Sequence, residues 1–225
     1  MILAQGEEPL VRWDWVADHT DLYLEKLIEH IQLTVIAVGI GLLISLPVGI
    51  YVYLHRRAFP PVTAFTGILY TIPSLALFAF LVPYTGFSYV TAEIGLVSYT
   101  LLILIRNVVA GLQGVPDDAK DAARGMGYSA RQLLWRVELP LAVPAIMTGV
   151  RVATVTTIGL VTVTALIGLG GFGGLILDGW QTFFNTLTLT GSVLSIGLAV
   201  AADGLLLLAQ KLVAPWYQGA RRTFG

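Results

Sequence analysis

The stretch DDAKDAARGMGYSARQLLWRVELPL, residues 117–141, is the longest polar interval in an otherwise apolar chain. It follows Pro116 and opens with two aspartates. Both features are typical of a helix N-terminus, where the first N–H groups lack partners and negative charge is favoured. Gly125 and Gly127 are expected to end that helix, because glycine adopts the left-handed conformation that closes many helices. The first part of the stretch therefore predicts a short helix and a glycine turn.

The second part of the stretch predicts another short helix. Ser129 followed by Gln132 matches a capping box, in which each side chain bonds the backbone N–H of the other residue. Pro140 and Pro144 come next, and because proline disfavours helix at the preceding residue, we expect them to bracket a turn into the next apolar segment. Residues 117–141 should thus form a helix, a glycine turn and a helix outside the apolar segments.

The composition indicates a membrane protein. Of the 225 residues, 56% are hydrophobic and 12% are charged, which is about half the charged fraction of a soluble domain. The formal net charge is −1 and no basic cluster stands out, so we expect no nucleic-acid partner. The chain has no cysteine and its three histidines are far apart, so we expect no metal site.

Five apolar segments are each near the roughly 20 residues that a helix needs to cross a bilayer. They lie at about Ile31–Leu54, Val62–Val82, Ile94–Leu112, Ala142–Leu169 and Leu189–Val213. Residues 1–30 are acidic and aromatic, which is typical of an extracytoplasmic or interfacial lead-in, and residues 214–225 form a cytoplasmic tail. The expected fold is an all-α membrane protein with about five transmembrane helices over residues 31–213, interrupted by the polar loop 117–141.

Basic residues set the expected orientation. If the 117–141 loop lies in the cytoplasm, ten of the thirteen Lys and Arg lie on that side, namely Arg56, Arg57, Arg106, Lys120, Arg124, Arg131, Arg136, Lys211, Arg221 and Arg222. Only Arg12 and Lys26 then lie outside, and Arg151 lies within a segment. Cytoplasmic loops carry the excess of Lys and Arg, so we expect the N-terminus outside and the C-terminus in the cytoplasm.

A pattern in this loop resembles the EAA loop of ABC importer permeases. Asp121-Ala122-Ala123, three further residues and Gly127 are followed by Val137-Glu138-Leu139-Pro140. The family has Glu-Ala-Ala, three residues and Gly, and later a branched apolar residue, any residue and Leu-Pro. This chain departs from the family at Asp121, which keeps the charge on a shorter side chain. The resemblance implies a coupling helix that sits in a cleft of a cytoplasmic ATPase, with contacts from Asp121, Ala122, Ala123, Gly127, Leu139 and Pro140.

Two membrane segments are similar to those of the osmoprotectant permeases, which import glycine betaine, choline, carnitine and proline betaine. They are Thr71-Ile-Pro73-Ser74-Leu75-Ala76-Leu77 and the run from Gly149 to Gly173, which ends in Gly168-Leu-Gly170-Gly171-Phe-Gly173. The resemblance implies a bacterial cell-membrane protein that assembles with two ATPase subunits, a second permease copy or paralogue and an extracytoplasmic substrate-binding protein. ATP would bind to the ATPase partners, and no cofactor is expected on this chain.

Few residues suggest a path for a solute. Tyr70, Pro73, Ser74 and Thr157 are aromatic, helix-breaking or hydroxyl-bearing residues inside apolar segments. Pro73 either breaks the second helix and frees a carbonyl for a polar solute, or only kinks the helix. Packing and hydrogen bonds within the bundle explain the other three equally well.

Two charges, Arg151 and Asp203, lie within apolar segments that should run in opposite directions, so we expect them at similar depth. An ionisable group inside a membrane usually faces a partner or water. Two arrangements are open. Either the two side chains pair, or Arg151 reaches carbonyls of the 117–141 loop while Asp203 meets water in the path.

No catalytic site is expected. The chain lacks the Gly-x4-Gly-Lys-Ser/Thr loop of ATP-hydrolysing proteins, and the Gly168–Gly173 stretch lacks the strand context of a dinucleotide site. We expect a tight turn there, at which small residues let helices approach. The prediction is a permease subunit of an ATP-driven osmoprotectant importer. The alternatives are a permease for methionine or another amino acid, and a stand-alone secondary carrier, which would transport without an ATPase.

Overall fold

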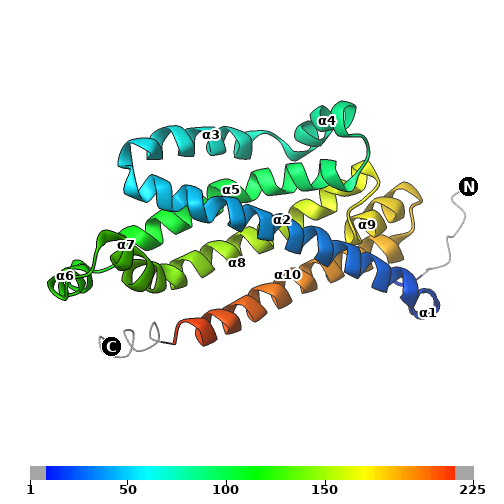
Figure 1. The fold of residues 1–225 in the computed structure, drawn as a ribbon. Coiled ribbons are helices and arrows are strands. Elements are labelled where there is room, and N and C mark those ends of the chain that lie inside the picture. The colour runs from blue at the N-terminus through cyan, green and yellow to red at the C-terminus, as the bar shows by residue number, and fades with distance from the viewer. Residues whose placement is uncertain (1–8, 216–225) are drawn as a thin grey trace, which may run out of the picture.

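The computed structural model describes residues 9–215, and all of the regular structure in that range is helical (Figure 1). The helices are α1 (Trp13–Asp18), α2 (Thr20–Leu54), η1 (Arg56–Ala58), α3 (Phe59–Thr71), α4 (Ser74–Thr85), α5 (Tyr89–Gln113), α6 (Asp117–Gly125), α7 (Ala130–Leu133), η2 (Leu134–Glu138), α8 (Leu139–Val163), η3 (Thr164–Ile167), α9 (Phe172–Gln181) and α10 (Asn185–Val213). The first eight residues of the predicted lead-in and most of the predicted tail lie outside the described residues.

Four helices in this range are long and apolar enough to cross a membrane: α2, α5, the continuous helix Ala130–Ile167 and α10. The pair α3–α4 adds a fifth crossing if it is counted as one span. This confirms the expected all-α membrane fold. The first span begins at Thr20, earlier than predicted, because its polar first turns are compatible with helix: Lys26 pairs with Glu29 one turn later at 3.1 Å.

The second predicted segment, Val62–Val82, is divided into two helices at Pro73, so of the two expectations for this proline the break is confirmed and the simple kink is not. The chain bends by 92° between α3 and α4. Pro73 has no backbone N–H to continue α3, and the residue before it, Ile72, is extended with φ −62° and ψ 127°. The carbonyl of Ile72 accepts a hydrogen bond from the Tyr99 hydroxyl of α5.

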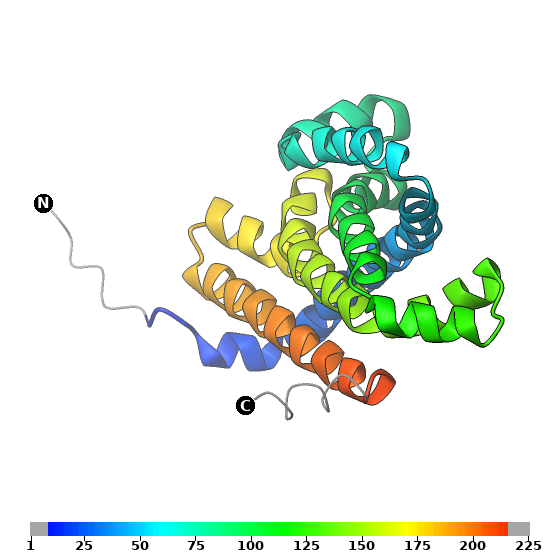
Figure 2. The same ribbon diagram turned by 90° about the vertical axis from the view of Figure 1, so that its left-hand side faces the viewer.

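The centre of the bundle is built from α2, α5 and α8, with α3 and α4 on one side and α10 on the other (Figure 2). Glycines permit close packing of the central helices. A Cβ added at Gly49 on α2 would lie 2.5 Å from Val108 of α5, and one added at Gly149 on α8 would lie 2.4 Å from Asn107. Such approaches are typical of small residues between membrane helices.

The turn expected at Pro140 and Pro144 is also wrong. The helix runs without a break from Ala130 to Ile167, and both prolines lie inside it. A π-helical turn, η2, ends at Glu138, two residues before Pro140, and the Leu139 N–H bonds the Leu134 carbonyl five residues back. This wider turn makes room for a ring that would otherwise clash with the preceding turn.

The glycine-rich stretch after α8 is a tight turn, as predicted. Gly168, Gly170 and Gly171 have φ of 82°, 109° and 52°, values that residues with a side chain rarely adopt. His30 of α2, which is fully buried, holds this turn against α2 and α8 through two hydrogen bonds. Its Nδ1 accepts the Phe172 N–H at 3.3 Å, so its Nε2 carries the proton and donates to the Ile158 carbonyl at 3.0 Å.

Candidate coupling surface

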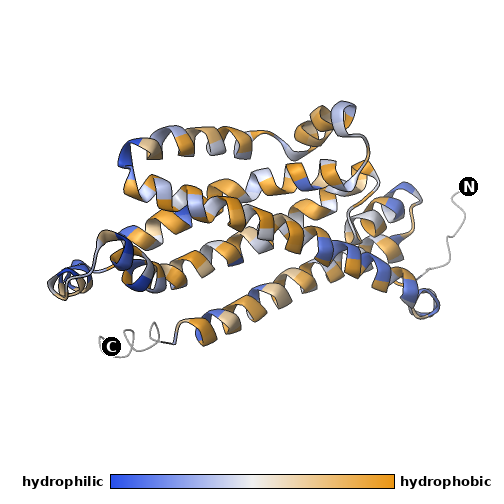
Figure 3. Cartoon of the chain, viewed as in Figure 1, coloured by the Kyte–Doolittle hydropathy of each residue, from blue (hydrophilic) through white to orange (hydrophobic). Residues whose placement is uncertain are grey.

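The most prominent feature outside the bundle is α6, which projects from one end of it (Figure 1). Figure 3 shows that α6 and α7 are largely hydrophilic. The C-terminus of α6 is closed by two hydrogen bonds, from the Tyr128 N–H to the Ala123 carbonyl and from the Gly127 N–H to the Arg124 carbonyl. Together with φ of 81° at Gly127, they form a Schellman motif. The predicted helix and glycine turn are confirmed.

The predicted ATPase-coupling residues of α6 differ in their exposure and in their contacts. Asp121 forms an exposed ion pair with Arg124 on the same helix at 2.8 Å, so its carboxylate already has a partner. Ala122 is exposed, but Ala123 is buried against the chain itself at 1% exposure. The side of α6 that carries Ala123 faces inward in the isolated chain, and its contact with an ATPase stays a prediction.

Between the two glycines, Met126 is 68% exposed. Sequence reasoning missed this residue. An exposed, flexible apolar side chain at the tip of a projecting turn is a candidate anchor for a partner surface. The signal available in the sequence was an apolar residue between two glycines in a polar loop.

Beyond the glycine turn, the second short helix begins with the predicted capping box. The Gln132 N–H donates to Ser129 Oγ at 3.4 Å, and the Ser129 N–H donates to Gln132 Oε1 at 2.8 Å. Leu139 and Pro140 are half-buried where this helix passes into α8. They lie within the continuous helix Ala130–Ile167, which joins the loop to a membrane span.

A second connection between the loop and the bundle is the hydrogen bond from the Tyr53 hydroxyl of α2 to Glu138 Oε1, at 2.9 Å. Glu138 is 5% exposed. The structure thereby links α2 to the π-helical turn at the base of the loop. The buried acidic residue before Leu-Pro was visible in the sequence, but its partner lies 85 residues away and no local pattern indicates it.

The predicted solute-path residues do not form one surface. Tyr70 packs edge-to-face on Tyr99, with ring centroids 6.0 Å apart. Pro73 and Ser74 lie at the same bend between α3 and α4, the first exposed and the second half-buried. Thr157 is instead buried in α8 at 1% exposure. The structure therefore brings Tyr70, Pro73 and Ser74 together and leaves Thr157 in the core.

The two intramembrane charges form a bidentate ion pair. Arg151 of α8 donates from Nε to Asp203 Oδ1 at 2.9 Å and from a terminal nitrogen to Oδ2 at 2.8 Å, and Asp203 belongs to α10. Of the two open arrangements, the structure has the pair. Its side chains are 23% and 40% exposed on the isolated chain. The helix that carries Asp203, α10, lies on the opposite side of the bundle from α3 and α4 (Figure 2).

Within residues 9–215, no three His, Asp or Glu side chains lie together in a way that would hold a metal ion. The described part of the chain thus presents a membrane bundle, a projecting polar hairpin and a charge pair.

Comparison with known proteins gives a consistent family. The family model described as binding-protein-dependent transport system inner membrane component matches residues 37–217. The choline transport system permease protein OpuBB of Bacillus subtilis is 33% identical over 192 residues, which cover 85% of this chain and 88% of that protein. The osmoprotectant import permease protein OsmW of Salmonella typhimurium is 34% identical over 199 residues, which cover 86% and 93%.

Solved structures show the same fold. An inward-facing form of the MetNI methionine ABC transporter matches with a TM-score of 0.77 at 23% identity, covering 85% of this chain and 96% of that one. An amino acid ABC transporter with histidines matches with a TM-score of 0.67 at 19% identity, covering 89% and 98%. The helical bundle and the matched family agree, and the chain belongs to the binding-protein-dependent transport system inner membrane components, the multi-pass membrane permeases of ABC importers.

Proposed function

We propose that this chain is the permease subunit of an ATP-driven importer for osmoprotectants of the glycine betaine, choline, carnitine or proline betaine class. The substrate class is supported by relatives such as OpuBB and OsmW, whose names refer to choline and to osmoprotectants. It is also supported by the Thr71–Leu77 and Gly149–Gly173 segments. The methionine and amino-acid transporters support only the fold, because they are less than 25% identical.

The mechanism rests on the projecting α6 hairpin, which consists of α6, the glycine turn and α7 (residues 117–133). Its second helix continues without a break into the α8 span. In the proposed assembly, two cytoplasmic ATPase subunits bind ATP and receive the hairpins of two permease copies, while a binding protein delivers solute from outside. Closure of the ATPases displaces α6, and the helix Ala130–Ile167 transmits the displacement into the membrane. The contact face consists of Asp121, Ala122, Met126 and Gly127. Leu139 and Pro140 lie in the helix that transmits the displacement.

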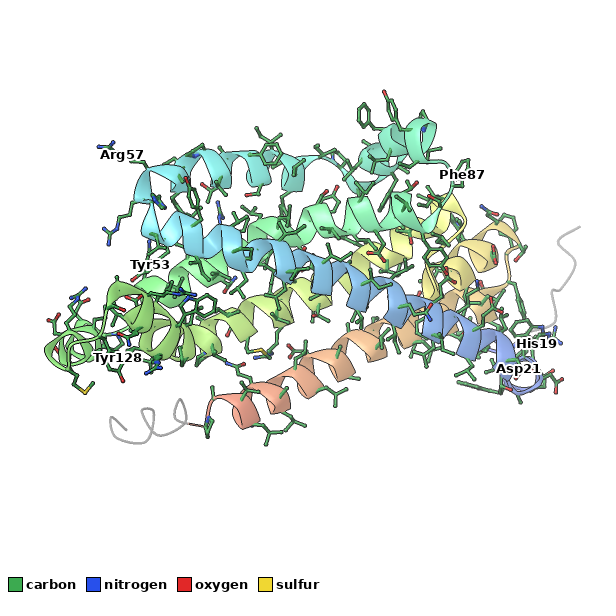
Figure 4. The ribbon with its side chains drawn as sticks, viewed as in Figure 1. His19, Asp21, Tyr53, Arg57, Phe87 and Tyr128 are labelled. Atoms are coloured by element: carbon green, nitrogen blue, oxygen red, sulfur yellow. The ribbon has the colours of Figure 1, made fainter. Side chains whose placement is uncertain are left out.

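The proposed orientation places α6 in the cytoplasm. Figure 4 shows Tyr53, Arg57 and Tyr128 at one end of the bundle, and His19, Asp21 and Phe87 at the other. Most Lys and Arg of the sequence belong to the first end, and cytoplasmic loops carry such an excess. The N-terminus would then lie outside and the C-terminus inside.

The Arg151–Asp203 pair indicates which side of the bundle faces protein or water. An ion pair exposed to lipid tails is costly, and such groups face a bundle interior or an aqueous cavity. We assign this side, formed by α8 and α10, to the second permease copy or to the aqueous path between the copies.

Reconstitution tests the proposal. The permease is placed in proteoliposomes with its ATPase and binding protein, and uptake of radiolabelled glycine betaine and choline is measured with and without ATP. We expect ATP-dependent uptake that methionine does not inhibit. Uptake without the ATPase would identify a stand-alone carrier, and inhibition by methionine would identify an amino-acid importer.

A further inference from the structure

Glu93 is an acidic residue of the α5 span that takes no part in the proposed coupling mechanism. It lies one turn after Tyr89, the first residue of α5. Both carboxylate oxygens are buried, and neither has a hydrogen-bond partner among residues 9–215. A carboxylate within a membrane span is costly unless a cation or hydrogen-bond donor compensates it. The site is therefore incomplete in the isolated chain.

A groove covers this residue. Its volume is about 420 Å³, within the range of roughly 300–1,000 Å³ typical of small-molecule sites. Its lining consists of Ile40 of α2 and Tyr89, Val90, Glu93, Ile94, Val97 and Ser98 of α5, and the Ser98 hydroxyl donates to the Ile94 carbonyl. The walls are thus almost wholly aliphatic and aromatic, and the only acidic group among the lining residues is Glu93.

The described basic residues near this end of the bundle are already paired. Arg12 lies 3.6 Å from Asp14, and Lys26 lies 3.1 Å from Glu29. Residues 1–8 contain no Lys or Arg. The next basic residue along α5, Arg106, is about 20 Å away at 1.5 Å per residue. A second copy of the chain would bring the same paired residues, so we assign the cation for Glu93 to another molecule.

We propose that this groove, with Tyr89 and Glu93, binds a quaternary ammonium group. Such a cation carries its charge on methyl groups and offers no N–H, so it suits aliphatic walls and a carboxylate that no donor surrounds. Tyr89 and Glu93 are four residues apart on one helix and therefore lie on the same face. An aromatic ring beside a carboxylate combines cation–π and Coulomb attraction for this class of ligand.

The ammonium group has two sources, a free solute such as choline or the headgroup of phosphatidylcholine. In either case Glu93 selects against a zwitterion that carries its own carboxylate close to the ammonium, because the two carboxylates repel each other. The site should therefore prefer choline and tetramethylammonium to glycine betaine. This selectivity deepens the proposed function, since it names choline-type cations as the preferred members of the solute class, but the binding itself requires neither ATP nor import.

The test is tetramethylammonium binding to the assembled transporter in nanodiscs of phosphatidylethanolamine and phosphatidylglycerol, measured by calorimetry against a sodium chloride control. Glu93→Gln keeps the shape and removes the charge, so we expect binding at least tenfold weaker. The matched control is Glu25→Gln, which removes an exposed carboxylate from the same end and should bind as the wild type does. If Glu93→Gln fails to assemble, the order of affinities on the wild-type protein (tetramethylammonium and choline above glycine betaine) is the deciding measurement.

The outcomes are distinct. Equal binding by the wild type and Glu93→Gln, glycine betaine binding as tightly as choline, or an equal effect of sodium chloride would each overturn the inference. Loss of tetramethylammonium binding in nanodiscs that contain phosphatidylcholine would assign the site to the lipid headgroup, whereas retained binding would assign it to a free solute. Failure of ATP-dependent uptake in the wild type would contradict the proposed function and leave the binding result intact.

Discussion

Replacing Gly127 by alanine should destabilise the Schellman turn that closes α6, although the added methyl group meets no steric conflict. Gly127 has φ of 81°, and a Cβ added there would meet nothing within 4 Å. The cost is therefore conformational and arises because an L-residue in the left-handed region is less stable by about 1–2 kcal/mol. Since 1.36 kcal/mol corresponds to a factor of ten, the population of the closed Schellman turn should fall by roughly 5–30-fold relative to open turns.

The neighbouring glycine supplies a matched control. Gly125 ends α6 without a positive φ, and a Cβ there also meets nothing within 4 Å. Gly125→Ala should therefore be neutral or stabilise the helix by about 0.5–1 kcal/mol. The assays are amide hydrogen exchange at Tyr128, whose N–H bonds the Ala123 carbonyl at 3.1 Å, and co-purification of the ATPase.

We expect faster exchange and weaker ATPase association for Gly127→Ala, and neither effect for Gly125→Ala. The bulkier Gly127→Leu should insert normally into the membrane but lose import. If Gly127→Ala leaves both exchange and ATPase association at their wild-type values, the reasoning that ties the turn geometry to docking is refuted.

Three further predictions concern the membrane bundle. In this cysteine-free chain, Thr182→Cys should react in intact cells with an impermeant thiol reagent and Ser129→Cys should not; the reverse pattern would invert the proposed orientation. Arg151→Asp and Asp203→Arg should each reduce assembly, and the double swap should restore part of it; a double variant as poor as the singles would contradict a functional pairing. Tyr99→Phe removes the bond to the Ile72 carbonyl at the α3–α4 bend and should lower the free energy of unfolding by about 1 kcal/mol, seen as a lower melting temperature in detergent; an unchanged melting temperature would show that water replaces the hydroxyl.

Local signals in the sequence predicted local structure well. The α6 boundaries, the left-handed Gly127 and the capping box at Ser129 all depend on residues within a few positions of one another, so short-range chemistry determines them. The number of apolar segments could also be predicted from the sequence, because each segment must reach across the same bilayer. The expected family rested on the resemblance of this loop to the EAA loop of ABC importer permeases.

Features that depend on distant contacts were either missed or left as alternatives. Ala123 faces inward because of how the hairpin packs, and spacing alone does not show this. Pro140 stays inside a helix because the π-helical turn before it relieves the clash that usually ends one. The choice between two arrangements for Arg151 was settled only by the side-by-side packing of α8 and α10, which brings Asp203 within reach.

The most direct test of the account is whether the tip of α6 touches the ATPase. A photocrosslinking amino acid is placed at Met126, which is 68% exposed, and for comparison at Phe87, which is 72% exposed at the other end of the bundle (Figure 4). The account predicts that irradiation of cells links position 126 to a protein with an ATP-binding P-loop, and that position 87 yields no such product. An ATPase adduct from position 87, or none from position 126 in cells that import the solute, would contradict it.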